Sequence, residues 1–172
     1  MAEINKIFEE RQFKKGEQLK EAGKICKYLG FILSGSISHS VRTQKGTTNS
    51  FQINDKPTFV SDAFSIYRNE PNQLVLECIE DSTILVARLE DVLKLLDKSL
   101  PFNRLILKVV AKELVAFLEM QITFSQGSSD ENYQFILDKH PEFIQKFPLK
   151  LLASMLDITP TQMSRVRKNL NK

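Results

Sequence analysis

The sequence predicts an α+β protein in which a β-rich N-terminal half is followed by one long helix and several short ones. Three observations give this prediction. Residues 11–90 form short apolar runs separated by glycine or polar turns, residues 101–126 are apolar at helical spacing, and residues 149–168 describe two short helices joined by a tight corner. Because short strands at regular intervals are typical of β-sandwiches and barrels, the N-terminal half is expected to have one of these folds.

The N-terminal half contains five strand candidates, and residues 89–98 return to a helical pattern. The candidates are residues 30–33, 36–43, 49–53, 74–78 and 82–88. Glycines stand mostly where turns between strands are needed, at positions 16, 23, 30, 35 and 46. Glycine suits such turns because it adopts positive φ angles without steric cost.

The long helix over residues 101–126 has two apolar sides. One seam consists of Leu107, Val110, Leu114 and Phe117, and a second flank of Ile106, Val109, Leu118 and Ile122. Two apolar sides need two partners, so we expect one side to pack on the β domain and the other on the same helix of a second copy. The alternative is a helix buried in the core of a monomer, the more usual place for apolar stripes.

A hinge is expected after the long helix, at Gly127 and the following SSDE. Ser128 and Glu131 form a capping-box pattern ahead of a helix over residues 132–140. We therefore expect three parts, namely an N-terminal domain over residues 1–100, a helix and hinge over 101–127, and a C-terminal helical domain over 128–172.

The last two helices are strongly marked in the sequence. Thr159 is suited to an N-cap, Pro160 to the first helical position, and Gln162 to the capping-box partner three residues after the cap. Ile158 is expected to fill the corner. The apolar positions predicted to face inward are Leu152, Ala153 and Leu156 on the first helix and Met163, Val166 and Leu170 on the second.

With these positions turned inward, Thr161, Ser164, Arg165 and Lys168 must face outward together. This is how the second helix of a helix-turn-helix presents donors to a major groove, so the pattern favours binding of double-stranded DNA. We expect Arg165 to contact a guanine edge, with Thr159, Thr161, Gln162 and Ser164 nearby and Arg167, Lys168 and Lys150 on phosphates. The alternative is an ordinary surface hairpin with solvated charges.

The charge distribution agrees with this assignment. From Gln145 onward there are six cations and one anion, a net charge of +5, whereas the preceding residues carry 18 cations and 20 anions. A basic end on a nearly balanced body fits a protein whose end binds phosphates.

Composition limits the class of protein. A chain of 172 residues with 42% hydrophobic content can bury a core. The sequence has no apolar stretch of membrane-spanning length and no secretory signal pattern, so we expect a cytoplasmic location and no membrane partner. Cys26 and Cys78 are too few for a disulfide scaffold, and both are expected to be buried.

The order of parts, together with the motifs FKKGEQLKEAG, FILSGSI, LECIEDSTILVARLEDV and HPEFIQKFPLKLLASMLDITPTQMSRVRKNL, resembles the Crp/Fnr family of transcription regulators, and most of all its Bacteroidetes branch. The resemblance implies a cyclic-nucleotide-binding-type jelly roll, a homodimer joined through residues 101–126 and a C-terminal helix-turn-helix. It also implies RNA polymerase as a partner, and an inverted-repeat DNA site with half-sites ~10 bp apart.

The chain departs from this family's cyclic-AMP-binding pattern. Members that bind cyclic AMP hold the ribose with a glycine-glutamate pair and the phosphate with an arginine-serine pair. The corresponding stretch here, DKPTFVSDAFSIYRNEPNQLVLECIED, has no such glutamate, and Asn72 and Gln73 stand near the arginine position. We therefore expect cyclic AMP not to be the effector. The residues that this correspondence places around any effector are Phe59, Asp62, Arg68, Asn72 and Gln73. Phe51, Phe59 and Phe64 could instead fill such a cavity.

Other departures concern DNA contacts and the N-terminus. Thr161 stands where the family often has a glutamate, so a different half-site is expected. Asp157 replaces the usual corner glycine, which aspartate tolerates because it enters the left-handed region readily. The N-terminal helix of many relatives is expected to be shortened or absent.

No cofactor is expected. Two cysteines cannot form a four-cysteine iron-sulfur site, and His39 or His140 is a weak candidate for a haem ligand. A cupin-like enzyme would need several metal-binding histidines, and the β region has only His39, so we do not expect an enzyme. The alternative to a DNA-binding regulator is a small-molecule sensor or protein-interaction module whose helix-turn-helix is vestigial.

Overall fold

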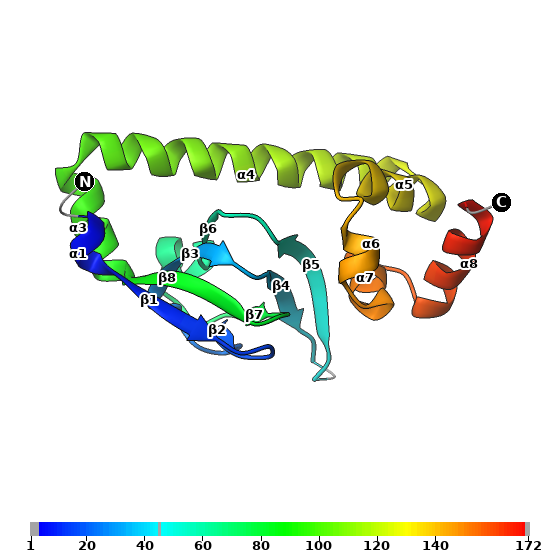
Figure 1. The fold of residues 1–172 in the computed structure, drawn as a ribbon, viewed down its shortest axis with the longest axis horizontal. Helices are drawn as coiled ribbons and strands as arrows, with labels where there is room; N and C mark the ends of the chain where they lie inside the picture. Colours follow the sequence, from blue (N-terminus) through cyan, green and yellow to red (C-terminus); the bar gives the residue numbers. More distant parts are fainter. Residues whose placement is uncertain (1–3, 45, 171–172) are drawn as a thin grey trace. The chain divides into compact units, whose positions relative to one another are not determined.

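A computed structural model describes residues 4–44 and 46–170 (Figure 1). The chain divides into two compact units, residues 1–110 and 111–172, and each is described by itself. The division falls within the long helix α4, which spans Leu100–Gln126.

The first unit contains two antiparallel sheets, each with four strands among its described residues (Figure 1). The strands are β1 (Phe8–Phe13), β2 (Gln18–Lys20), β3 (Tyr28–Ser34), β4 (Ile37–Arg42), β5 (Thr48–Asn54), β6 (Phe59–Val60), β7 (Leu74–Cys78) and β8 (Ser82–Arg88). One sheet has the order β1-β8-β3-β6 and the other β2-β7-β4-β5. The chain crosses repeatedly between the sheets, which confirms the predicted sandwich-like architecture.

The core lies between the two sheets. Its buried members come from six strands and are Leu19, Ile32, Ile37, Val60, Leu74, Leu76, Cys78, Ile84 and Val86. Gly30, the first residue of a predicted strand, lies within β3, where an added Cβ would approach the Leu19, Ile84 and Val60 side chains at 3.0–3.1 Å. Its role is therefore close packing across the core rather than a positive φ angle.

The five expected strands are present, with ends that differ by up to two residues. Strands β1, β2 and β6 were not anticipated. β1 exposes four of its six residues and so lacks the alternating pattern that marks a half-buried strand, and β2 and β6 have only three and two residues. The six-residue helix α2 (Ala63–Arg68) was not predicted either.

Short helices lie at both ends of the β-structure. α1 (Ile4–Ile7) precedes β1, so a short helix stands before the first strand of the described residues. α3 spans Leu89–Lys98, as predicted. A second cluster contains Leu29, Ala87, Val92, Leu95 and Phe102, with Ile106 packed against it. The first turns of α4 therefore belong to the first unit. Leu118 and Ile122, which were expected on the same flank as Ile106, are instead 47% and 57% exposed.

The second unit is helical. After α4 come α5 (Ser129–Lys139), α6 (Phe143–Lys146), α7 (Leu149–Met155) and α8 (Pro160–Leu170). Helix α5 begins three residues earlier than predicted, because Ser128 is its N-cap and forms a complete capping box with Glu131. No described helix is long and apolar enough to cross a membrane.

Candidate functional site

Helices α7 and α8 are joined by a tight corner. Asp157 adopts the left-handed conformation there, with a φ of 51°, as expected from its place at the usual glycine position. The Asp157 N–H donates to the Ser154 carbonyl at 3.1 Å and the Ile158 N–H to the Ala153 carbonyl at 3.0 Å. These bonds occupy carbonyls at the end of α7 and fix the direction in which the chain leaves it.

The start of α8 is a capping box. The Gln162 N–H donates to Thr159 Oγ1 at 3.2 Å, and the Thr159 N–H donates to Gln162 Oε1 at 2.8 Å. The Thr159 hydroxyl also donates to Gln162 Oε1, at 2.9 Å. The predicted N-cap and its partner are thus confirmed. The side-chain oxygen of Gln162 is already engaged as the acceptor of both Thr159 hydrogen bonds.

The inner faces of α7 and α8 are buried as predicted. Leu152, Ala153, Leu156, Met163 and Val166 are all at most 6% exposed. Ile158 is half-buried at the corner. The side chain of Leu170, the sixth expected core position, lies outside the described residues.

The outer face of α8 presents polar side chains. Thr161, Arg165 and Lys168 are exposed, and their spacing of four and three residues places them on one side of the helix. Ser164 is also exposed, but its hydroxyl donates to the Pro160 carbonyl at 3.0 Å. Among the expected base-contacting residues, Thr161 and Arg165 therefore have the side chains least engaged in holding α8 itself together.

Two expected phosphate contacts differ in their surroundings. Lys150 is exposed on α7, whereas Arg167 is half-buried on α8. The Arg167 guanidinium lies beside the hydroxyl of the buried Tyr133 on α5: burial raises the pKa of Tyr133, and Arg167 partly opposes this shift. Arg167 therefore joins α8 to α5, a structural contact that could not be predicted from residue spacing.

Helix α4 exposes a continuous apolar stripe. Its members are Leu107 (65% exposed), Val110 (57%), Leu114 (54%), Leu118 (47%) and Ile122 (57%). They are three or four residues apart and so share one face. Such a row of half-exposed leucine, valine and isoleucine side chains is unusual on a solvent-facing helix.

The segment expected to hold an effector centres on Asp62, the N-cap of α2. Its carboxylate accepts hydrogen bonds from the Phe64 N–H at 3.0 Å, the Ser65 hydroxyl at 2.5 Å and the Asn72 amide at 2.7 Å. The Lys20 ammonium lies 3.6 Å away, and both charged side chains are at most 1% exposed. Asp62 and Asn72 thus lie in contact, as their expected place around an effector requires. Lys20, which was not predicted to take part, lies beside both.

Burial and hydrogen bonding act in opposite directions on this pair. Burial by itself raises the pKa of Asp62, but hydrogen bonds from Ser65 and Asn72 and the charge of Lys20 outweigh it, so the pKa lies below its ordinary value. Burial also lowers the pKa of Lys20, and the nearby Asp62 charge only partly compensates.

The other expected effector residues do not gather at Asp62. Phe59 packs edge-to-face on Phe31, with ring centroids 4.8 Å apart. Arg68 is exposed at the end of α2 and lies over the Phe64 ring, 5.7 Å from its centroid. Gln73 is exposed and accepts the Arg42 N–H through its carbonyl. Phe64 itself is 51% exposed, so the expectation that it fills a cavity was wrong.

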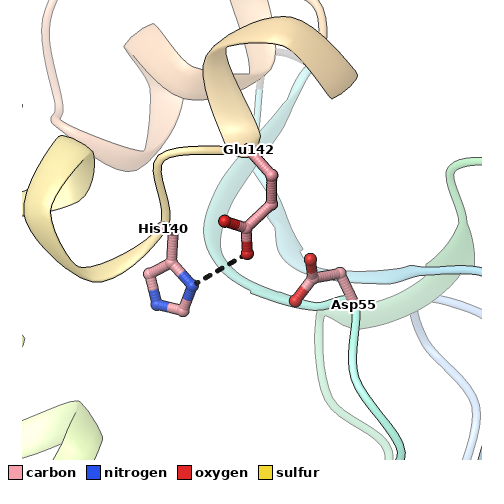
Figure 2. A group of neighbouring side chains, drawn as sticks. All are labelled: Asp55, His140 and Glu142. Atoms are coloured by element: carbon pink, nitrogen blue, oxygen red, sulfur yellow. Dashed lines mark ion pairs between the residues drawn. The ribbon is translucent and has the colours of Figure 1, made fainter.

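The two histidines have different environments. His39 lies on β4, edge-to-face with Phe51, and burial lowers its pKa to about 4. His140 ends α5, stacks on Phe143 with ring centroids 4.3 Å apart, and has Nδ1 3.9 Å from Glu142 Oε1 (Figure 2). Cys26 and Cys78 are buried free thiols, as predicted, and burial raises the pKa of Cys78 to about 11.

Solved structures share the fold across nearly the whole chain. The FixK2 protein of Bradyrhizobium japonicum matches with a TM-score of 0.77 and 12% identity, covering 96% of this chain and 85% of that one. The regulator CLP of Xanthomonas campestris matches with a TM-score of 0.74 and 14% identity, covering 99% and 89%. A Eubacterium rectale protein described as a Crp/Fnr transcriptional regulator matches with a TM-score of 0.77 and 14% identity, covering 99% and 81%.

Comparison of the sequence with protein-family models identifies the first domain. A search of curated proteins found no match. The family model for the cyclic nucleotide-binding domain, however, matches residues 10–99, which hold all of β2–β8 and the Lys20–Asp62 pair. The chain therefore belongs to the cyclic nucleotide-binding domain family, and it has the fold of Crp/Fnr regulators.

Proposed function

We propose that this protein is a sequence-specific DNA-binding transcription regulator of the Crp/Fnr type. The observation that carries the proposal is the outer face of α8, where Thr161, Arg165 and Lys168 are exposed together on a capped helix that follows a tight corner. A helix held in this way presents its first turns to the major groove in helix-turn-helix proteins.

The chemistry of the exposed side chains fits base and phosphate contacts. The planar guanidinium of Arg165 can donate two hydrogen bonds to the O6 and N7 of guanine, and Thr161 can contact a thymine methyl group or donate to a base. Lys168 and Lys150 are suited to phosphates, which take a point charge without geometric demands. Since Gln162 and Ser164 bond within α8, their contribution to base discrimination is expected to be smaller.

The proposal includes a homodimer formed through the apolar stripe of α4, Leu107 to Ile122. Two copies of this stripe would cover each other, and two α8 helices would then contact successive half-sites of an inverted repeat. In this arrangement residues 1–100 form the sensor-type domain, 101–127 the dimerisation helix and hinge, and 128–172 the DNA-binding domain. RNA polymerase is a further partner of regulators of this type.

We also propose that cyclic AMP is not the effector. A cyclic phosphate needs a cation and fixed donors, yet Arg68 is exposed beside Phe64, and the buried cation Lys20 faces Asp62. The neighbour CLP is described as responsive to cyclic di-GMP and as linking cell-cell signalling to virulence gene expression, which shows that this fold serves gene regulation with other ligands.

Binding to duplex DNA at several salt concentrations tests the proposal. Lys168→Ala is expected to weaken binding to all sequences about equally and to reduce the salt slope by about one charge. Arg165→Ala is expected to cost roughly 1–3 kcal/mol on the preferred site and to relax the preference at one base pair. A folded dimer without salt-dependent affinity would favour the alternative, a sensor or interaction module with a vestigial helix-turn-helix.

A further inference from the structure

Lys20 on β2 is a buried cation whose acceptors all come from the chain itself. Its Nζ donates to the Asn72 carbonyl at 3.1 Å, to Asn72 Oδ1 at 2.7 Å and to the Leu74 carbonyl. An ammonium group has three protons. These three acceptors therefore use its full donor capacity, with the Asp62 carboxylate 3.6 Å away as counter-charge.

The Asp62 carboxylate is likewise satisfied from within. One oxygen accepts the Phe64 N–H, and the other accepts the Ser65 hydroxyl and the Asn72 amide. Lys20 is 3% and Asp62 0% exposed, so a dissolved anion has no water-exposed surface from which to reach the Lys20 ammonium. The donors beside this carboxylate, which could otherwise meet an external phosphate, are already engaged.

The same network fastens α2 to the surrounding strands. The Ser65 hydroxyl accepts the Cys26 N–H at 2.9 Å, just before β3. Asn72 accepts the Gly23 N–H on its carbonyl at 2.8 Å and the Leu74 N–H on its side chain at 2.9 Å. Both ends of the segment from Asp62 to Asn72 are thus anchored, and both anchors converge on the Lys20–Asp62 pair.

We propose that the Lys20–Asp62 pair locks α2 in a single position in place of a bound effector, so that the first unit keeps its conformation without any anionic ligand. Removing either charge leaves the other buried and uncompensated, which strongly disfavours the locked position. This consequence rests on the proposed function: DNA binding is independent of an effector, because a ligand can act only by binding two positions of α2 with different affinity, and the lock leaves α2 one position.

Hydrogen exchange of the full-length protein tests the lock directly. The amides of Ile66 and Asn69, which bond to the Asp62 and Ser65 carbonyls, report on α2. In the wild type they should be protected, and millimolar cyclic AMP or inorganic phosphate should leave their exchange unchanged. Lys20→Met should speed their exchange by about 100-fold. The matched control, Lys24→Met, removes an exposed lysine that pairs with Glu21 at 2.8 Å and should change nothing.

A second variant keeps the test decisive if Lys20→Met does not fold. The double variant Lys20→Met/Asp62→Asn removes both charges and should fold, because a buried pair replaced as a whole costs little. Its α2 exchange should still exceed that of the wild type, since the three bonds from Lys20 are lost.

Either of two results would overturn the lock. In the first, cyclic AMP or phosphate slows the exchange of the α2 amides in the wild type by about tenfold or more. In the second, these amides exchange in Lys20→Met at the same rate as in the wild type. DNA affinity is measured on the same samples and should be the same with and without these anions. Lack of DNA affinity in a wild type with normal α2 protection would refute the proposed function and leave the lock standing.

Discussion

The apolar stripe of α4 allows the most quantitative prediction. We choose Leu114→Glu, because Leu114 lies at the middle of the stripe and is 54% exposed. If a second copy covers this face, the substitution acts twice in each dimer. If this face of α4 stays in contact with water, the substitution replaces an exposed apolar side chain by an exposed charged one. It then has little effect on the free energy of folding.

The magnitude follows from the exposed area. Full burial of a leucine or valine side chain is worth about 1.5–3 kcal/mol, so covering the exposed half of each stripe residue contributes about 1 kcal/mol. Five residues in each of two copies then contribute about 10 kcal/mol, comparable to the general cost of association. Leu114→Glu removes about 2 kcal/mol of this per dimer and adds two carboxylates to a dry interface. The dimer Kd should rise by about 100-fold or more.

Sedimentation equilibrium of the full chain measures this Kd. Ala116→Glu is the matched control, because Ala116 is exposed and two residues away, on the opposite side of the helix. It introduces the same charge and should leave the dimer intact. Equal weakening by both variants, or a wild type that is monomeric at concentrations well above the micromolar range, would refute the assignment of the stripe as a dimer interface.

Three further predictions concern the fold. Thr159→Ala removes the cap of α8 and should destabilise that helix by about 1 kcal/mol, seen as faster exchange of its amides, whereas the exposed non-capping Thr161→Ala should not. Asp157→Gly should stabilise the α7–α8 corner by about 0.5 kcal/mol, because relief of left-handed strain slightly exceeds the added entropy of the unfolded chain; a loss of stability would mean that the Asp157 side chain has another role. The pKa of His39 is about 4 in the folded protein and about 6.5 when unfolded, so between these values the unfolded state binds more protons and stability falls as the pH falls. Urea denaturation should show a loss approaching about 3 kcal/mol from this group by pH 4, and His39→Gln should remove that part of the slope; an unchanged slope would contradict the burial argument.

Local signals account for what could be predicted from the sequence. The capping boxes at Ser128 and Thr159 could be recognised because each depends on residues three positions apart. The start of α8 was predicted correctly, whereas α5 was predicted to begin three residues too late. The left-handed corner at Asp157 was expected because the resemblance to the family places a glycine there and aspartate tolerates this conformation. The helix over residues 101–126 could be predicted because a regular apolar pattern needs no tertiary information. Its two predicted apolar sides were not reproduced, because the exposed stripe takes residues from both.

Features that depend on distant residues could not be predicted. Lys20 and Asn72 bond although they are 52 residues apart, and no spacing rule connects them. Strand β1 is held by its register with β8, from Phe8 opposite Ala87 to Phe13 opposite Ser82, and not by an apolar pattern of its own. Arg167 was assigned to phosphates from its charge, and only the packing of α5 shows it beside Tyr133.

Selection of bound sequences from random duplex DNA tests the central claim most directly, with wild type and Arg165→Ala in parallel. We expect the wild type to enrich an inverted repeat without any added effector, and Arg165→Ala to lose one specified base pair in each half-site. Failure of the folded wild-type dimer to enrich any sequence, with or without cell-extract small molecules, would contradict the assignment of α8 as a DNA-contacting helix.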